Sequence, residues 1–397
     1  MNLESKKVGL FCFDGPLYRD RNGLYCSTTL TDEMFSRFFS CVDVLYVVIR
    51  VFDVDRSSEE MHMKYLNTER IIIIPVANIV SVKGLISEKP KFEKSIESIV
   101  TKADMIFARM PSVISNSIAK ICLRYKKPYL VEVGGCSWDS YKNHSIKGKI
   151  VAPLMYYWEK KYVRKATYAT YVTKQFLQHR YPNPNITTNC SNVYLQTTDK
   201  EVLEKRLNKI ESFDLNRPVF GQVVASVEVK YKGEQYFIKA MRELKKRGIV
   251  ARFEIVGPGE CDYLVKQAEE NGVINQVVFL GAKKKEEVFE WLRSIDIYIQ
   301  PSKQEGLPRS VIEAMSVGCP CIGSKIAGIP ELLDEDCLFN PDNTREISSV
   351  AEKLLTIPNM KKKAEDNFER AKEYNLEEIE ERRQNIFSQY SNQVFGR

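Results

Sequence analysis

Apolar residues in this chain gather in short runs, and the segments between these runs have apolar positions at helical spacing. Such alternation of strands and helices predicts an α/β fold. The expected strands fall into two groups, which predict two domains. The first group covers residues 8–13, 43–51, 70–76, 105–108, 128–133 and 166–172, and the second covers residues 219–225, 252–256, 276–280, 295–299 and 320–323.

The boundary between the two groups is marked by a change in composition. Residues 181–192 are rich in Asn, Thr and Pro, and the charged segment 199–216 predicts a connecting helix and linker. A chain of 397 residues is long enough for two domains with sizeable cores. We therefore expect a first domain at residues 1–198, a second at 199–375, and a C-terminal helix within residues 376–397.

The clearest local pattern lies in residues 295–323 of the second group. A β-branched and aromatic run ends at Pro301 and predicts a buried strand. Pro308 suits the first position of a helix, and Gly318 suits its left-handed cap. The loop 302–307 should then lie at the carboxyl end of a parallel strand, where such sheets bind ligands. Free backbone N–H groups and the helix dipole favour a phosphate there.

Two glutamates stand eight positions apart in this segment, Glu305 in the loop and Glu313 in the helix. This spacing places two carboxylates near the start of one helix, where a nucleotide-sugar can lie. Simpler interpretations stay open. Glu313 is four residues after Arg309, so the two can form a surface ion pair of about 0.3–0.5 kcal/mol, and Glu305 can be a solvated loop residue.

The segment resembles the nucleotide-binding signature of retaining glycosyltransferases with the GT-B fold. These are the group 1, family 4 enzymes, which include capsule and lipopolysaccharide transferases. Their pattern is Glu-Gly-(Phe/Leu)-x5-Glu-Ala-Met-Ala, and this chain carries it as Glu305-Gly306-Leu307 followed by Glu313-Ala314-Met315-Ser316. The resemblance extends over most of the chain and is stronger in the second half.

The resemblance implies two Rossmann-like domains facing across a cleft, with the last helix crossing back to the first domain. It also implies transfer of a sugar from a nucleoside-diphosphate sugar, UDP being the expected nucleotide, to a saccharide or polyprenyl-diphosphate-linked acceptor, with no cofactor and no metal. The expected catalytic residues are Lys232 and Glu305. The expected donor-binding residues are Gly306, Leu307, Pro308, Arg309, Glu313, Gly257 and Gly281. Lys232 can alternatively be one more surface lysine beside Lys230.

The first domain is expected to hold the acceptor. Candidate residues there follow the predicted strands and are Gly23, Arg109, Asp139 and His144. This chain departs from the family at two positions, so the roles of the family's residues there cannot be assigned to it. Many relatives have a histidine at about Gly134, and many have an arginine near Ala225 that acts together with the lysine.

Charge is distributed unevenly along the chain. The whole chain has a net charge of +7, whereas residues 101–200 hold 16 Lys and Arg against 5 Asp and Glu. Such a basic region suggests an acidic partner. No nucleic-acid-binding motif is present, so we expect no nucleic acid. Residues 145–165 place Leu154, Tyr157, Trp158 and Tyr162 near several lysines, which suits an anionic membrane surface. Alternatively, this stripe packs on the sheet and the lysines are solvated.

The remaining composition favours a cytoplasmic enzyme. Ten scattered cysteines and three histidines offer no metal-type spacing and suggest reduced thiols. The N-terminus enters a strand without a signal peptide, and no apolar run is long enough to span a membrane. We expect a cytoplasmic location, at the inner face of the cell membrane if the basic segment docks there. An epimerase or phosphorylase of the same fold, or a non-catalytic basic binding protein, remains an alternative.

Overall fold

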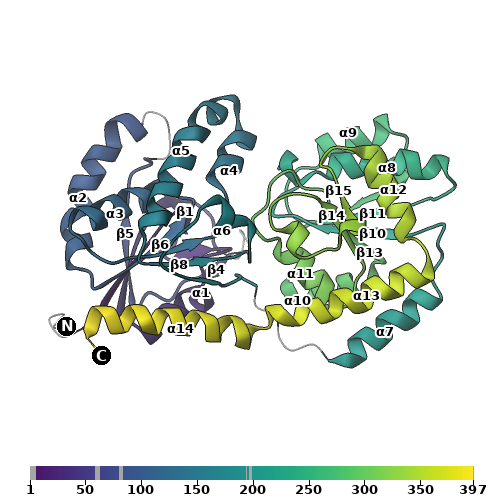
Figure 1. The fold of residues 1–397 in the computed structure, drawn as a ribbon. Coiled ribbons are helices and arrows are strands. Elements are labelled where there is room, and N and C mark those ends of the chain that lie inside the picture. The colour runs from purple at the N-terminus through teal and green to yellow at the C-terminus, as the bar shows by residue number, and fades with distance from the viewer. Residues whose placement is uncertain (1–5, 59–62, 80–83, 194, 196–198, 397) are drawn as a thin grey trace. The chain divides into compact units, whose positions relative to one another are not determined.

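The computed structural model describes residues 6–58, 63–79, 84–193, 195 and 199–396. The chain divides into two compact units (Figure 1). Unit 1 comprises Met1–Val172, Leu177–Cys190 and Glu381–Arg397, and unit 2 comprises Thr173–Phe176 and Ser191–Glu380. The division between the main parts thus falls at residue 190 rather than at the expected 198, and the C-terminal helix joins unit 1 from Glu381 onward.

Unit 1 contains a nine-stranded sheet. Its strands are β1 (Val8–Arg19), β2 (Tyr25–Ser27), β3 (Val44–Asp53), β4 (Lys64–Tyr65), β5 (Ile71–Pro75), β6 (Met105–Met110), β7 (Leu130–Val133), β8 (Tyr168–Tyr171) and β9 (Ile186–Asn189). The parallel part runs β5-β3-β1-β6-β7-β8-β9, and β2 and β4 add an antiparallel extension to β1.

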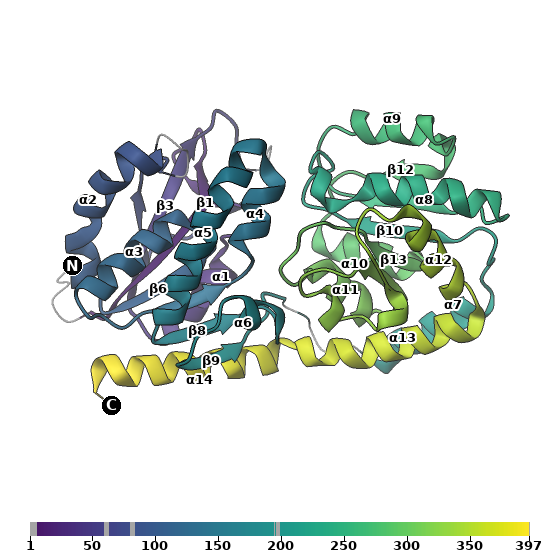
Figure 2. The ribbon, with the colours of Figure 1, turned by 45° about the horizontal axis from the view of Figure 1, so that its top comes forward.

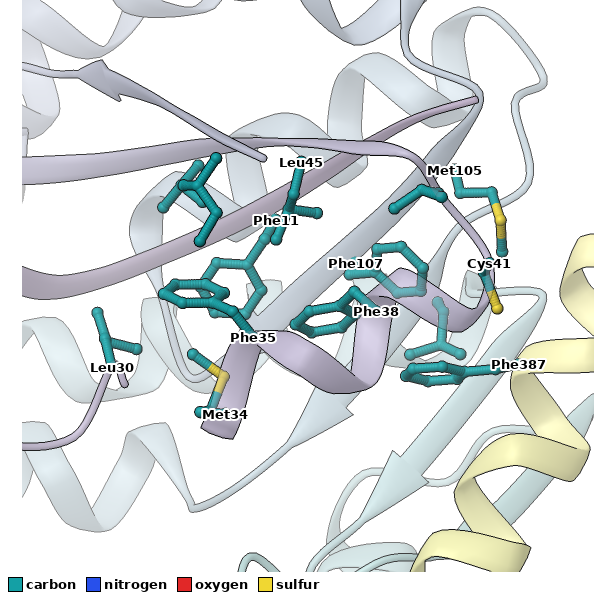
Figure 3. Packing of buried hydrophobic residues seen from close by; sticks show 14 of the residues in the cluster. Phe11, Leu30, Met34, Phe35, Phe38, Cys41, Leu45, Met105, Phe107 and Phe387 are labelled. Carbon is teal, nitrogen blue, oxygen red and sulfur yellow. The ribbon is translucent and has the colours of Figure 1, made fainter. Parts of the chain in front are cut away.

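Helices cover both faces of this sheet (Figure 2). They are α1 (Asp32–Ser36), α2 (Lys89–Lys102), α3 (Val113–Arg124), α4 (Ser137–His144), α5 (Ile146–Lys165), the short α6 (Phe176–Arg180) and most of α14 (Leu376–Phe395). The aromatic core of the unit lies where β1 and β6 meet α1, the 3-10 turn η1 (Arg37–Ser40) and α14. Figure 3 shows Phe11, Phe35, Phe38, Phe107 and Phe387 packed together there.

Unit 2 contains a six-stranded sheet in the order β12-β11-β10-β13-β14-β15, and all its strand pairs are parallel. The strands are β10 (Val219–Val223), β11 (Arg252–Val256), β12 (Val277–Phe279), β13 (Ile297–Gln300), β14 (Cys321–Ser324) and β15 (Leu338–Phe339). The helices are α7 (Lys200–Glu211), α8 (Glu234–Lys246), α9 (Asp262–Glu270), α10 (Lys285–Ser294), α11 (Arg309–Ser316), α12 (Thr344–Leu354) and α13 (Ile357–Ala371).

The fold class expected from the sequence is confirmed, since each unit is built on a parallel sheet and the last helix packs into unit 1. The carboxyl ends of β10 and β13, which pair directly, bring the β10–α8 and β13–α11 connections to one edge of the unit 2 sheet. In parallel α/β sheets this edge is where ligands bind.

Candidate functional site

The two residues expected to be catalytic lie in contact in unit 2. Lys232 ends the 3-10 turn η3 (Lys230–Lys232) before α8, and Glu305 lies in the loop between β13 and α11. The Lys232 ammonium donates a hydrogen bond of 2.8 Å to Oε1 of Glu305. Only 18% of the Lys232 side chain and 9% of the Glu305 side chain are exposed. The contact is thus a largely buried ion pair rather than an encounter of solvated surface groups.

Two further side chains hold the Glu305 carboxylate. Ser302 Oγ donates to Oε1 at 2.7 Å, and Gln300 Nε2 donates to the same oxygen at 3.0 Å. Tyr298 Oη in turn donates to Oε1 of Gln300 at 2.9 Å and fixes the orientation of that amide. Sequence reasoning missed Ser302 and Gln300. The signal was present, because polar residues at the end of a buried strand need partners.

A glycine brings the Lys232 turn against the β13–α11 loop. Gly233 has a φ of +85°, and a Cβ at this position would lie 2.0 Å from the carbonyl oxygen of Pro301. The backbone N–H of Lys303 donates to the carbonyl of Tyr231 at 2.8 Å across the same junction. Only glycine combines this backbone conformation with so close an approach. The Lys232–Glu305 contact therefore depends on a rigid junction between the two loops.

Helix α11 carries the second glutamate of the motif on its partly exposed side. Its other side is buried by Val311, Ile312, Ala314 and Met315. Burial raises the pKa of the Glu313 carboxyl above its ordinary value, and the charges of Arg309 and Lys285 only partly oppose this. Among the described residues no salt bridge joins Arg309 to Glu313, although the charge of Arg309 still acts on the Glu313 carboxyl.

The start of α11 differs by one residue from the prediction. Pro308 is the N-cap, with an extended ψ of 113°, and the helix begins at Arg309. Proline has no N–H, so the donors at this helix end belong to its neighbours. The carbonyl of Gly306 accepts a hydrogen bond of 2.9 Å from Gly328 N, and Leu307 is buried. These contacts hold the loop in place beside Glu305.

Gly257 and Gly281 meet beyond the ends of β11 and β12. The Gly257 N–H donates to the Gly281 carbonyl at 2.9 Å. A Cβ at Gly257 would lie 2.6 Å from the carbonyl oxygen of Val224, which follows β10. Both glycines therefore belong to the same edge of the sheet as Lys232, and the close approach requires the first of them to be glycine.

Arg109 lies on β6 in unit 1, within a buried charge cluster. Arg37 Nη2 is 2.7 Å from Oε2 of Glu132, and Arg109 Nε is 3.4 Å from the same oxygen. Burial favours the neutral form of Glu132, but the charges of Arg37, Arg109 and Arg383 outweigh this and lower its pKa below the ordinary value. Arg109 thus helps to satisfy a buried carboxylate on the neighbouring strand.

The other three candidates of the first domain occupy separate places. Gly23 lies in the turn between β1 and β2, with a φ of +78°. We expected residues 14–23 to form a loop after the first strand. Instead, β1 resumes pairing with β3 after an irregularity between Cys12 and Pro16 and continues to Arg19, so the turn that holds Gly23 is shorter than expected. Asp139 lies on α4, 3.6 Å from Arg180. His144 is the last residue of α4, and its side chain lies outside the described part of the structure.

Asp14 is a buried group that the sequence pattern did not single out. Its carboxylate accepts hydrogen bonds from the backbone N–H groups of Val113 at 2.6 Å and Ile114 at 2.9 Å, and from Ser112 Oγ at 2.9 Å. Burial raises the pKa of Asp14 in spite of these donors. A carboxylate is stabilised by the free N–H groups at a helix N-terminus, and Asp14 occupies this place at the start of α3.

In the described part of the chain, no group of three or more His, Cys, Asp or Glu side chains is arranged to hold a metal ion. All ten cysteines are free. None of the described helices is both long and apolar enough to cross a membrane.

A family model matches the part of unit 2 that contains these residues. The model of the family "Glycosyl transferases group 1" matches residues 218–357, which include Lys232, Glu305 and Glu313. Protein CapJ of Staphylococcus aureus is 30% identical over 384 residues, covering 96% of this chain and 95% of CapJ. The amylovoran biosynthesis glycosyltransferase AmsK of Erwinia amylovora is 35% identical over 129 residues, which is 31% of each chain.

Solved structures share the fold over nearly the whole chain. Sucrose-phosphate synthase from Thermosynechococcus elongatus superposes with a TM-score of 0.65 at 14% identity, covering 96% of this chain and 98% of the other. HepE from Anabaena, determined with UDP and glucose, superposes with a TM-score of 0.61 at 15% identity, covering 99% and 100%. At these identities the similarity is one of fold.

Proposed function

The chain belongs to the group 1 glycosyl transferases, and from this premise we propose that it is a retaining enzyme of surface polysaccharide synthesis. Its donor is a nucleoside-diphosphate sugar, with UDP as the nucleotide, and its acceptor is a saccharide or a polyprenyl-diphosphate-linked sugar. The observation that carries the proposal is the buried contact between Lys232 and Glu305 at the carboxyl edge of the unit 2 sheet. The similarity to AmsK, a biosynthesis glycosyltransferase, supports the proposed class of pathway. The similarity to HepE, which was determined with UDP, supports UDP as the nucleotide of the donor.

In this proposal Lys232 stabilises the negative charge that grows on the departing diphosphate. A fixed cation in a largely buried place stabilises such charge more than a solvated one does. The N-terminal N–H groups of α11 and the exposed Arg309 add to the positive potential on the same side. No arginine near Ala225 is needed for this arrangement.

The two glutamates hold the neutral parts of the donor. The three hydrogen bonds to Glu305 described above all go to Oε1. A sugar hydroxyl can therefore donate to Oε2 without displacing them. Glu313 accepts hydrogen bonds from the ribose hydroxyls, because a carboxylate has several acceptor sites. Its partial burial excludes water that would compete for these bonds.

The chemical step follows from this placement. The bond between the anomeric carbon and the diphosphate oxygen breaks, and the acceptor oxygen bonds to the same face of the sugar. The departing diphosphate takes the proton of the acceptor hydroxyl, so no separate protein base is required. Because Lys232 supplies the positive charge, we propose that the reaction does not need a metal ion. The free cysteines fit a reducing compartment, and we place the enzyme in the cytoplasm.

A donor screen followed by product analysis tests the proposal. We expect UDP-sugars to raise the melting temperature of the purified protein more than GDP- or ADP-sugars do. With a saccharide acceptor, the product should keep the anomeric configuration of the donor, as measured by NMR. An inverted product would contradict retention. Formation of a sugar phosphate from added inorganic phosphate would indicate a phosphorylase instead, and epimerisation without an acceptor would indicate an epimerase.

A further inference from the structure

Four large apolar side chains form an exposed stripe along helix α5 (Ile146–Lys165) of unit 1. Their exposed fractions are 80% for Ile146, 77% for Ile150, 44% for Leu154 and 61% for Tyr157. Successive members are four, four and three positions apart, so they lie on one side of the helix. The opposite side buries residues such as Ala152 and Val163 against the unit. The stripe is thus apolar surface beyond what the fold of unit 1 uses.

The exposed side of α5 is also strongly basic. Its exposed charged residues are all cations, namely Lys147, Lys149, Lys160, Lys161, Arg164 and Lys165. The one acid of the helix, Glu159, is fully buried and accepts a hydrogen bond of 2.9 Å from the Ser137 N–H. Apolar residues dominate the first three turns, and cations dominate the last two. The outward face therefore combines an apolar stripe with a positive field.

The stripe differs from the one predicted from the sequence. Tyr162 was expected on it but is only 6% exposed, and its carbonyl accepts a hydrogen bond from Tyr129 Oη. Trp158 is partly buried, with the Lys89 ammonium 3.6 Å from its ring centroid. The prediction was wrong for these two residues because the helix turns them toward the unit. Leu154 and Tyr157 are exposed as expected, and Ile146 and Ile150 extend the stripe.

We propose that the outward face of α5 docks the protein on a bilayer surface that contains anionic lipid. A helix lying in the interface buries its apolar side to a depth of about 5–10 Å, while its basic residues contact the headgroups. The isoleucines and Leu154 suit the acyl boundary, and Tyr157 suits the headgroup level. This interaction is independent of the glycosyltransferase proposal above, because α5 lies in unit 1 and carries none of the donor-site residues.

Other occupants fit the face less well. A second copy placed face to face would bring two sets of cations together, and like charges in contact repel. A nucleic acid would use the cations, but its phosphate backbone offers nothing to the aliphatic side chains. An anionic bilayer is complementary to both components of the face at once.

Vesicle co-sedimentation of the full-length protein tests the proposal. The vesicles contain phosphatidylcholine with or without 30% phosphatidylglycerol, at low and at high salt. We expect binding to the anionic vesicles at low salt, weaker binding at high salt because salt screens the charges, and little binding to phosphatidylcholine alone. Absence of binding to anionic vesicles at low salt would overturn the proposal.

Two variants separate the apolar and the basic components. Ile146→Ser/Ile150→Ser and Lys160→Gln/Lys161→Gln/Arg164→Gln should each weaken binding at least tenfold. All substituted side chains are exposed, so an unchanged melting temperature will confirm that the variants fold. If the serine variant binds as tightly as the wild type, the attraction is electrostatic adsorption alone and the docking proposal is wrong.

Matched substitutions in unit 2 serve as controls. Lys239→Gln/Arg242→Gln/Lys266→Gln removes the same number of exposed cations, and Val250→Ser/Ile274→Ser removes two exposed apolar residues. Both should bind vesicles nearly as well as the wild type. If the controls lose as much binding as the α5 variants, the interaction depends on overall charge and hydrophobicity, which contradicts a specific docking face.

Discussion

Lys232 donates a 2.8 Å hydrogen bond to Oε1 of Glu305 across 73 positions of the sequence. In our proposal the first residue binds the diphosphate of the donor and the second binds its sugar. The carboxylate therefore orients the ammonium before the donor arrives, and the donor phosphates then share the ammonium with it. Such preorganisation avoids reorganising the site at the moment of reaction.

The first prediction concerns Lys232. Lys232→Ala should lower kcat by about 10²–10³, because it removes a fixed cation from the position where charge develops. Steady-state kinetics with the preferred donor measures the effect. Lys230→Ala is the matched control, since Lys230 is exposed and lies over the ring of Tyr263 instead. An equal loss in both variants would mean that general basic charge, and not Lys232, stabilises the leaving group.

A double-mutant cycle tests whether Lys232 and Glu305 act together. Glu305→Gln keeps the size of the side chain and removes the charge that orients the ammonium. Residues in direct contact are expected to show non-additive effects. The double variant should therefore lose less activity than the product of the two single losses. Strict additivity would contradict a functional coupling through the 2.8 Å contact.

The second prediction concerns Glu313. Glu313→Ala should raise the donor KM roughly 10- to 150-fold, because hydrogen bonds to a charged group contribute about 1.5–3 kcal/mol. The pKa of Glu313 is raised by burial, so the wild-type carboxylate is protonated at a higher pH than an ordinary glutamate. As the pH is lowered, the donor KM of the wild type should therefore begin to rise at a higher pH than an ordinary glutamate would give. Glu313→Gln should remove this pH dependence. The exposed Glu290→Ala should change neither the donor KM nor its dependence on pH.

Most parallel strands of both units could be predicted because they are short apolar runs. Strand β9 (Ile186–Asn189) could not, because it is mostly polar and partly exposed. The elements that were missed are short or lie at the edge of a sheet. Strand β4 (Lys64–Tyr65) has only two residues, both exposed, and β15 (Leu338–Phe339) is equally short. The extension of β1 beyond Cys12 passes through Gly15 and Pro16, which normally predict a turn. Pairing with β3 overrides that local preference.

Only those residues of the site that belong to a sequence motif could be predicted. Lys232 and Glu305 were identified from short patterns, but nothing local indicates that they touch. Their contact arises because β10 and β13 are neighbours in the sheet, which is a property of the topology. The burial of Glu234 could not be predicted either, since acidic residues in the first turn of a helix are usually solvated.

The third prediction is metal independence. The charge on the departing diphosphate is balanced by Lys232 and the N-terminal N–H groups of α11 in our proposal. Turnover should therefore be unchanged after the enzyme is dialysed against EDTA and assayed in its presence. Loss of activity that manganese or magnesium restores would show that a metal ion takes part in binding or reaction.

The fourth prediction concerns the packing of the C-terminal helix into unit 1. Phe387 is fully buried and stacks on Phe38, with ring centroids 5.7 Å apart. Phe387→Ala should reduce the free energy of unfolding of unit 1 by about 3–5 kcal/mol, because it leaves a cavity in the aromatic core. Denaturant unfolding measures this change. The exposed Gln393→Ala on the same helix should have almost no effect.

The fifth prediction concerns Glu234, the first residue of α8. Glu234 is 1% exposed, and neither of its carboxylate oxygens has a hydrogen-bond partner among the described residues. Burial raises its pKa to about 8, although the charge of Lys232 partly opposes the shift. Folding thus favours the protonated form, and unfolding releases a proton between about pH 4.5 and pH 8. The free energy of unfolding should fall as the pH rises through this window.

Substitution by glutamine isolates this contribution. Glu234→Gln should match the wild type below about pH 4, where Glu234 is largely protonated in both the folded and the unfolded state. Above pH 8 it should be more stable by up to about 5 kcal/mol, since each pKa unit corresponds to about 1.4 kcal/mol. The tryptophan fluorescence of Trp291 reports on the unfolding of unit 2. A Trp138→Phe/Trp158→Phe background removes the tryptophan fluorescence of unit 1. The exposed Glu269→Gln should follow the wild-type curve. Parallel curves for Glu234→Gln and the wild type would show that Glu234 does not titrate in this range.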